Sequence, residues 1–271
     1  MCSRVFRSLC LRSNLQATRC YVTGSGGYKL DFSVGFLPHP LKKPYGEDAY
    51  FICNALVMGV ADGVGGSALH GIDPGEYASG LMAEAHNISS AMDSSGKRIC
   101  PLEVLQGAYE AVSDVAGSTT ACIAALNGDV LDVCNLGDSG CMIMRNNEIL
   151  YMSKEQTHGF NYPFQLGAES QDSPMDADMS SHTITEGDFV LLATDGVFDN
   201  LFQEQILDLF QKYQGDFSAL GTHVAEAAFD MASNRTENTP YAIRCHTMIG
   251  VAHMGGKMDD ITAVVARVCR V

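Results

Sequence analysis

Aspartates stand at the ends of several short apolar segments, and this repeated pattern constrains the fold more than any other feature of the 271-residue chain. Each segment has the length and composition of a buried strand. If these strands are neighbours in space, their ends bring several carboxylates into one small region. The segments and their aspartates are residues 57–61 before Asp62, residues 133–137 before Asp138, residues 190–194 before Asp195, and residues 261–265 after Asp259 and Asp260.

The repetition of this pattern predicts a site for divalent cations. A single Asp-Gly pair after a strand most often marks a turn, but carboxylates packed together repel one another unless protons or cations offset their charge. The candidate ligands are hard oxygen atoms with neither His nor Cys beside them, which favours Mg²⁺ or Mn²⁺ over zinc. Gly63 adds a backbone carbonyl next to Asp62.

The order of the expected elements favours antiparallel sheets. Strands follow one another in pairs, and Asn146-Asn147 forms the turn of one hairpin. Two helices are also consecutive: the first begins at the N-cap Asp73 with Pro74 behind it, and the second follows Pro101. This order differs from the alternating strands and helices of a doubly wound parallel sheet, so we predict an α+β fold.

The apolar periodicity places these elements along the chain. The expected strands are residues 49–53, 55–61, 118–126, 130–136, 141–145, 149–152, 182–184, 189–194 and 261–268. The expected helices run from Pro74 to about Met92, from Pro101 onward, and over residues 203–213 and 217–232. Residues 94–98, 169–181 and 234–256 are expected to be the soft, least firmly structured segments of the chain.

The N-terminus predicts a targeting segment. Its arginines are Arg4, Arg7, Arg12 and Arg19, and the first acidic residue is Asp31. An amphipathic, Arg-rich start without acidic residues is the composition of a mitochondrial transit peptide. We therefore expect residues 1–21 to be a transit peptide, residues 22–271 to form one domain, and the mature protein to lie in the mitochondrial matrix. A basic tail on a cytosolic protein is the alternative.

The bulk composition excludes several classes of protein. The formal net charge of −15 argues against a nucleic acid partner, and 46% hydrophobic residues is typical of a globular chain. No apolar run has the length that a transmembrane segment needs. The ten cysteines are scattered without a Cys-x-x-Cys pair, so we expect free, buried thiols in a reducing compartment.

At the aspartate motifs the chain resembles the protein phosphatase 2C family of metal-dependent Ser/Thr phosphatases. The resemblance covers roughly residues 45–268, and its later part, with residues 158–166 and Gly255-Gly256-Lys257, is most similar to a mitochondrial branch typified by the T-cell activation phosphatase. The motifs occur in the family's order: Glu47-Asp48, Asp62-Gly63-Val64-Gly65-Gly66, Ser118-Thr119-Thr120-Ala121, Leu136-Gly137-Asp138-Ser139-Gly140, Thr194-Asp195-Gly196-Val197-Phe198-Asp199-Asn200 and Asp259-Asp260-Ile261-Thr262.

The resemblance implies a four-layer αββα sandwich, in which helices flank two antiparallel β-sheets, and a site for two divalent ions. Asp62 would bridge both ions and Gly63 would bind one of them through its carbonyl. Asp195 and Asp259 would complete the other ion's ligands. Two more acids are implied, with Glu47 acting in the outer shell or through water and Asp138 matching a position that helps to hold a weaker third ion.

The implied activity is hydrolysis of phosphoserine and phosphothreonine in proteins, by a hydroxide that bridges the two ions. We expect mitochondrial phosphoproteins as substrates. Two positions depart from the family's pattern: Val64 replaces a His thought to protonate the leaving oxygen, and Lys43 replaces an Arg that often clamps the phosphate. We name His158 and Lys43 as candidate substrate contacts. The departures leave open a catalytically weak, phosphatase-like binding module.

Overall fold

Two five-stranded antiparallel sheets form the centre of the computed structural model, which describes residues 27–42, 44–66, 71–213 and 216–271. The expected transit peptide, residues 1–21, and the candidate Lys43 lie outside the described residues. The first sheet has the order β1 (Tyr28–Leu37), β14 (Ile261–Arg270), β13 (Phe189–Ala193), β7 (Gly140–Arg145) and β8 (Glu148–Met152). The second has the order β12 (Asp178–Thr183), β6 (Val130–Leu136), β5 (Ala121–Asn127), β3 (Val57–Asp62) and β2 (Asp48–Cys53).

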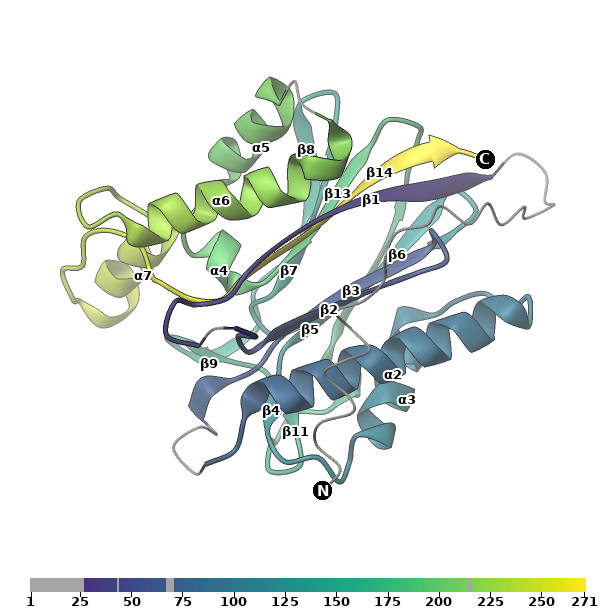
Figure 1. The fold of residues 1–271 in the computed structure, drawn as a ribbon, viewed down its shortest axis with the longest axis horizontal. Coiled ribbons are helices and arrows are strands. Elements are labelled where there is room, and N and C mark those ends of the chain that lie inside the picture. Colours follow the sequence, from purple (N-terminus) through teal and green to yellow (C-terminus); the bar gives the residue numbers. More distant parts are fainter. Residues whose placement is uncertain (1–26, 43, 67–70, 214–215) are drawn as a thin grey trace.

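Helices cover the outer face of each sheet (Figure 1). On the second sheet lie α2 (Pro74–Ser94) and α3 (Pro101–Ala111). On the first sheet lie α4 (Asp195–Phe198), α5 (Gln203–Lys212) and α6 (Leu220–Ser233), with α7 (Pro240–Ile249) beyond them. Short elements join these parts: β4 (Ser118–Thr119), β9 (Thr157–Gly159), β10 (Tyr162–Pro163), β11 (Leu166–Gly167), η2 (Pro174–Asp176) and η3 (Phe217–Ala219).

Three apolar layers hold this four-layer sandwich together, and they confirm the predicted αββα architecture. Strand β5 shows why its sequence is continuously apolar. Cys122 and Ala124 face the layer between the sheets, whereas Ile123 and Ala125 face the layer under α2 and α3. Because both faces are covered, alternate positions must both be apolar. A third layer lies between the first sheet and α4 to α6.

Local signals in the sequence set several element boundaries. The Asp73 carboxylate accepts a hydrogen bond from the Gly75 amide at 3.0 Å, and Pro74 occupies the first position of α2, as predicted. Asn146 and Asn147 both have positive φ, at 51° and 66°, in the predicted hairpin turn between β7 and β8. The ends of the predicted elements otherwise differ by a few residues, and the expected strand 118–126 is divided at Thr120 into β4 and β5.

The sequence analysis missed two elements, α7 and β1, and the start of a third, β12. Residues 234–256 contain α7, which Thr239 caps by accepting from the Ala242 amide at 3.1 Å. Strand β1 was not predicted, although it pairs with β14 over all ten of its residues. Strand β12 begins within the expected soft segment 169–181 and overlaps the expected strand 182–184; it is an edge strand that pairs with β6 through its backbone and exposes most of its side chains. Its stability does not depend on an apolar pattern.

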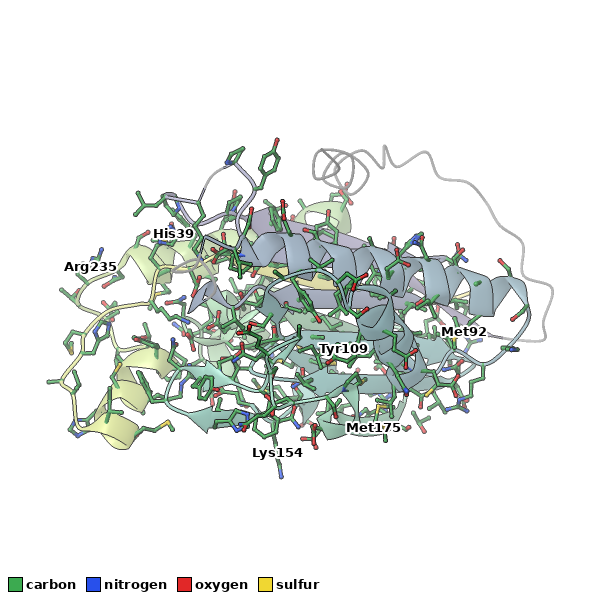
Figure 2. All side chains as sticks on the ribbon, turned by 90° about the horizontal axis from the view of Figure 1, so that it is seen from below. His39, Met92, Tyr109, Lys154, Met175 and Arg235 are labelled. Atoms are coloured by element: carbon green, nitrogen blue, oxygen red, sulfur yellow. The ribbon has the colours of Figure 1, made fainter. Side chains whose placement is uncertain are left out.

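The seven cysteines within the described residues are unpaired, as predicted, and five of them are buried. Among the described helices, none combines the length and the apolar composition that a membrane span requires. In Figure 2, Met92 near the end of α2 lies at the opposite end of the molecule from His39 and Arg235.

The contact between β1 and α6 leaves no room for a side chain. A Cβ at Gly35 would lie 2.1 Å from the carbonyl oxygen of Gly221 and 2.7 Å from the Cβ of Ala225. We therefore expect Gly35→Ala to lower the free energy of unfolding by about 1–3 kcal/mol, the usual cost of overpacking. Urea titration measures this change.

Gly159→Ala is the matched control, because a Cβ at that position meets nothing within 4 Å. Its free energy of unfolding should stay within about 0.5 kcal/mol of wild type. Equal stability of the two variants would contradict the packing described for β1 and α6.

Candidate active site

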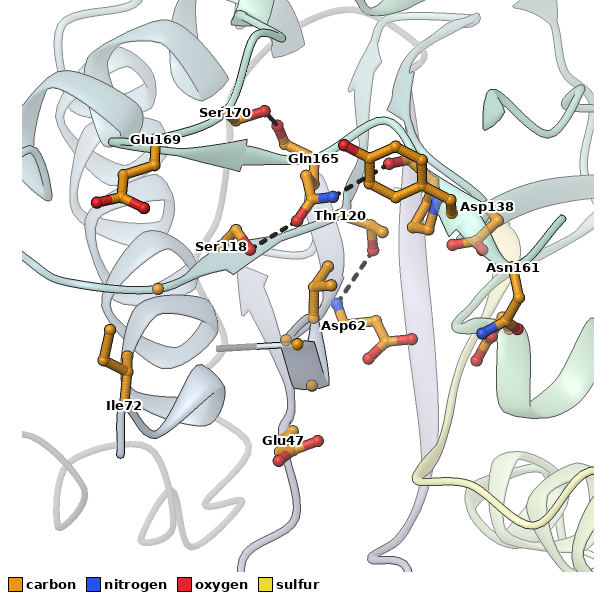
Figure 3. Close-up of a pocket in the computed structure, with 18 of the residues that line it drawn as sticks. Glu47, Asp62, Ile72, Ser118, Thr120, Asp138, Asn161, Gln165, Glu169 and Ser170 are labelled. Atoms are coloured by element: carbon orange, nitrogen blue, oxygen red, sulfur yellow. Dashed lines mark hydrogen bonds between the residues drawn. The ribbon is translucent and has the colours of Figure 1, made fainter. Parts of the chain in front are cut away.

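The strand-end acids gather in a pocket of about 870 Å³ at one end of the sandwich. Asp62 and Asp138 come from the second sheet, at the ends of β3 and β6, and Asp195 and Asp259 come from beside β13 and β14 of the first. Figure 3 shows Glu47, Asp62 and Asp138 on separate segments around this pocket. The charged residues that line it are Lys42, Glu47, Asp62, Asp138, Glu169, Asp195, Lys257 and Asp259.

Hydroxyl groups hold the backbone of Asp62 in place. The Asp62 carbonyl accepts from the Thr119 hydroxyl at 2.8 Å and from the Thr120 amide at 2.9 Å. The Asp62 amide donates to the Thr120 hydroxyl at 3.2 Å, which also lies 2.7 Å from the Ser139 hydroxyl. Ser118 donates to the Gln165 side chain at 2.7 Å. The hydroxyls of Ser118 and Ser139 therefore act in the hydrogen bonds that support the pocket.

Asp48 links the two sheets beneath the pocket. It lies opposite Asp62 in the β2–β3 register. One of its carboxylate oxygens accepts from the hydroxyls of Thr194 at 2.8 Å and Thr262 at 2.6 Å. This buried carboxylate thereby fixes the end of β13 and the start of β14 against the second sheet. All three residues belong to the sequence motifs, but the motifs did not predict that their side chains are in contact.

Asp260 positions the loop that carries Glu47. Asp260 is only 2% exposed. Its carboxylate accepts hydrogen bonds from the His39 amide at 2.7 Å and from the Glu47 amide at 3.1 Å. Lys42 lies 3.1 Å from the same carboxylate. Gly46 has a φ of +66°, and a Cβ there would lie 2.3 Å from an Asp260 oxygen. Sequence reasoning placed Asp260 only as the neighbour of Asp259.

Two lysine ammonium groups lie against the acids, and sequence reasoning missed both contacts. Lys257 contacts Asp195 and lies 3.0 Å from Asp259. Lys42 lies 2.5 Å from Glu47 and 3.5 Å from Asp259. No spacing rule could have found the contacts of Lys257 with Asp195 and of Lys42 with Asp259, because each of these two pairs joins segments far apart in the chain.

The crowding of carboxylates shifts their pKa values. Burial, followed by the charges of Asp48 and Asp195, holds the pKa of Asp62 well above its ordinary range. Burial and the charge of Asp195 raise the pKa of Asp138 to about 7, although Lys257 acts in the opposite direction. Burial also acts to raise the pKa of Asp195, but the Lys257 ammonium outweighs it and the net shift is downward. The cluster therefore carries more negative charge than its lysines offset.

The donor set fits hard divalent cations. One carboxylate oxygen of Asp138 and one of Asp195 are buried without a hydrogen-bond partner, which is costly unless a cation lies nearby. Among the described residues, no group of three or more His, Cys, Asp or Glu side chains has, in the positions seen here, the spacing to hold a metal ion. The ammonium groups of Lys42 and Lys257 lie between the carboxylates. Ion binding therefore requires these two lysine side chains to move.

Only glycine fits at position 63, since a Cβ there would lie 2.8 Å from the Glu47 carbonyl oxygen.

The structure does not support His158 as a substrate contact. Its ring lies 2.9 Å from an Asp172 oxygen and stacks on Phe164 with centroids 4.1 Å apart. It is absent from the residues that line the pocket, whereas Val64 lines it. Within the described part of the chain, the pocket lining contains no histidine at all.

Comparisons with known proteins give the same assignment as the motifs. A sequence model for the family described as Stage II sporulation protein E (SpoIIE) matches residues 54–269. Protein phosphatase PTC7 homolog fig of Drosophila ananassae is 37% identical over 246 residues, which cover 83% of this chain and 74% of that protein. Probable protein phosphatase 2C 80 of Arabidopsis thaliana is 38% identical over 240 residues, covering 86% of this chain and 57% of that protein.

Solved structures agree with this assignment. The photosystem II phosphatase PBCP has a TM-score of 0.80 with 30% identity, over 88% of this chain and 98% of that one. The catalytic domain of the phosphatase PstP, solved with 2 manganese ions, has a TM-score of 0.65 with 20% identity and shares the fold, over 89% of this chain and 99% of that one. Fold, acidic pocket and relatives together define a protein serine/threonine phosphatase. The chain belongs to the protein phosphatase 2C family.

The raised pKa of Asp138 predicts a pH dependence of stability in EDTA. The folded state holds this proton up to about pH 7, whereas the unfolded state releases it near 3.8. Since the folded state binds more protons in this window, its stability falls as pH rises through it. Asp138→Asn should therefore be more stable than wild type at pH 8, with little advantage at pH 4. Chemical unfolding at both pH values measures the difference, and an advantage that is equal at both would contradict the shift.

Proposed function

We propose that this phosphatase hydrolyses phosphoserine and phosphothreonine in proteins with two divalent cations, Mn²⁺ or Mg²⁺, held by the pocket acids. The observation that carries the proposal is the meeting of Asp62, Asp195 and Asp259 in one pocket on a chain of this family. The manganese ions in PstP, which has the same fold, support a divalent metal here. Carboxylate and carbonyl oxygens are the donors that these ions prefer.

The proposed ligand set follows the position of each acid. We assign Asp62 to both ions, because the charges of acids from both sheets act on it. The Gly63 carbonyl would serve one ion, and Asp195 with Asp259 the other. Glu47 would act in the outer shell or through water, and Asp138 would contribute to a weak third ion.

When bound, the ions supply an activated water molecule and positive charge for the phosphoryl oxygens. The chain's own residues position the ligands for them. Thr119 and Thr120 fix the Asp62 peptide, Asp260 fixes the loop of Glu47, and Lys42 links Glu47 with Asp259. Because no described histidine lines the pocket, we propose that solvent gives the leaving oxygen its proton.

Removing a ligand tests this function directly. We expect Mn²⁺-dependent cleavage of a phosphothreonine peptide and of a simple aryl phosphate, abolished by EDTA. Asp195→Ala should lower kcat/KM by at least about a hundredfold, as removal of one electrostatic contact in an active site does. Asp208→Ala is the control, because this exposed acid pairs with Lys212 on α5 outside the pocket. Full activity in EDTA would contradict the proposal, and phosphopeptide binding without turnover would favour a binding module.

We also propose that the enzyme acts in the mitochondrial matrix on phosphoproteins there, after removal of residues 1–21. The N-terminal arginines and the lack of acidic residues before Asp31 support this location. A fluorescent protein fused to the C-terminus of the full chain should accumulate in mitochondria, and the same fusion to residues 22–271 should stay in the cytosol. Cytosolic fluorescence from both fusions would contradict the proposal.

A further inference from the structure

The active-site pocket extends well beyond the strand-end acids. Its volume of about 870 Å³ is in the range of sites that enclose a whole small molecule, so it has room for more than a phosphoryl group. Away from these acids, its wall is formed by residues 116–118, residues 168–171 and Ile72. Figure 3 shows Glu169 at one side of the pocket and Asp138 at the other. A protein substrate would therefore contact this wall with the residues that flank its phosphorylated side chain.

The loop that carries Glu169 is fixed to this wall. Strand β11 pairs with β4 through Gly167 and Ser118, and a Cβ at Gly167 would lie 2.5 Å from the Gly117 carbonyl oxygen. After Glu169, the Ser170 amide donates to the Gly167 carbonyl at 3.1 Å and closes a turn. The pairing of the two strands therefore sets the position of the Glu169 backbone.

The Glu169 carboxylate is exposed and unpaired. It takes part in no hydrogen bond and no ion pair within the described part of the chain. The two lysines that line the pocket are used elsewhere, Lys42 against Glu47 and Lys257 against Asp195. Among the described residues of the lining, no positive side chain balances Glu169. Its charge is therefore available to a ligand that enters the pocket.

A basic side chain is the group that this carboxylate would bind. Lysine and arginine both donate charge-assisted hydrogen bonds to carboxylates. The formal net charge of −15 on the whole chain favours the approach of basic partners as well. An extended peptide advances about 3.3 Å per residue, so residues up to about four positions from the phosphorylated one lie within about 13 Å of it. The long side chains of lysine and arginine add to that reach.

We propose that Glu169 is a specificity-determining residue, which selects phosphoprotein substrates that carry a lysine or arginine within about four residues of the phosphorylated position. The inference rests on the proposed function, since it assumes that phosphorylated proteins bind in this pocket. Glu169 contacts the flanking residue of the substrate and takes no part in hydrolysis. Because solvent screens a pair at this exposed rim, the effect is a preference among substrates and not an absolute requirement.

A single-arginine scan tests the inference. The host is an alanine-rich phosphothreonine peptide, in which arginine replaces alanine at each flanking position in turn. For wild type, arginine at one or more positions should raise kcat/KM by about three- to fivefold over the all-alanine peptide, through a lower KM. Glu169→Gln should lose this rise, and Glu169→Lys should instead favour glutamate at the same position. The ratio is taken within each variant, so a change in its overall rate cancels.

Glu148→Lys is the matched control. Glu148 is an exposed acid on β8 that does not line the pocket, and its replacement changes the net charge by the same amount as Glu169→Lys. This variant should keep the preference of wild type for arginine. Higher ionic strength should weaken that preference in both proteins, because the pair is exposed to solvent.

The remaining results contradict either this inference or the proposed function. A wild-type enzyme without a preference for arginine, or a Glu169→Gln variant that keeps it, would overturn the role of Glu169. Loss of the preference in Glu148→Lys would assign it to overall charge and overturn that role equally. If wild type cleaves neither the peptides nor a simple aryl phosphate, the proposed function itself is contradicted. Glu169→Gln alone decides the matter if circular dichroism shows that Glu169→Lys is misfolded.

Discussion

Mutual repulsion of buried carboxylates is the constraint on which this structure depends. Acids from both sheets are brought to one end of the sandwich, where burial and like charge raise the pKa of Asp62 and Asp138. Such a cluster is stable only if cations or protons balance it. Lysines supply part of that balance, and hard divalent ions suit the oxygen donors that remain. The uncompensated negative charge that makes the carboxylates repel one another also favours binding of metal ions, and bound ions can then attract phosphate.

The surrounding fold resists this repulsion through packing and through hydrogen bonds that span the sheets. Apolar layers on both faces of each sheet fix the directions of the strands, so that their ends return to one place. Asp48 then bonds to Thr194 and Thr262 across the two sheets. Asp260 anchors the loop of Glu47 through two backbone amides, at His39 and Glu47. Carboxylates that do not line the pocket thus position those that do.

Much of the fold and the acidic lining of the pocket could be predicted, because both depend on local patterns. The start of α2 at Asp73 and Pro74, and the turn at Asn146-Asn147, follow from the preferences of those residues. The contacts of Lys257 could not be predicted, since 62 residues separate it from Asp195. Strand β12 exposes most of its side chains and has no apolar periodicity to recognise. The position of His158 outside the pocket lining could not be predicted, because its pairing with Asp172 depends on how two loops meet.

A crystal structure with Mn²⁺, with the ions located by anomalous scattering, is the most direct test of the central claim. We expect two manganese peaks in the pocket, with Asp62 between them and Asp195 and Asp259 on one ion. Manganese peaks away from these carboxylates, or a saturated crystal with none in the pocket, would contradict it.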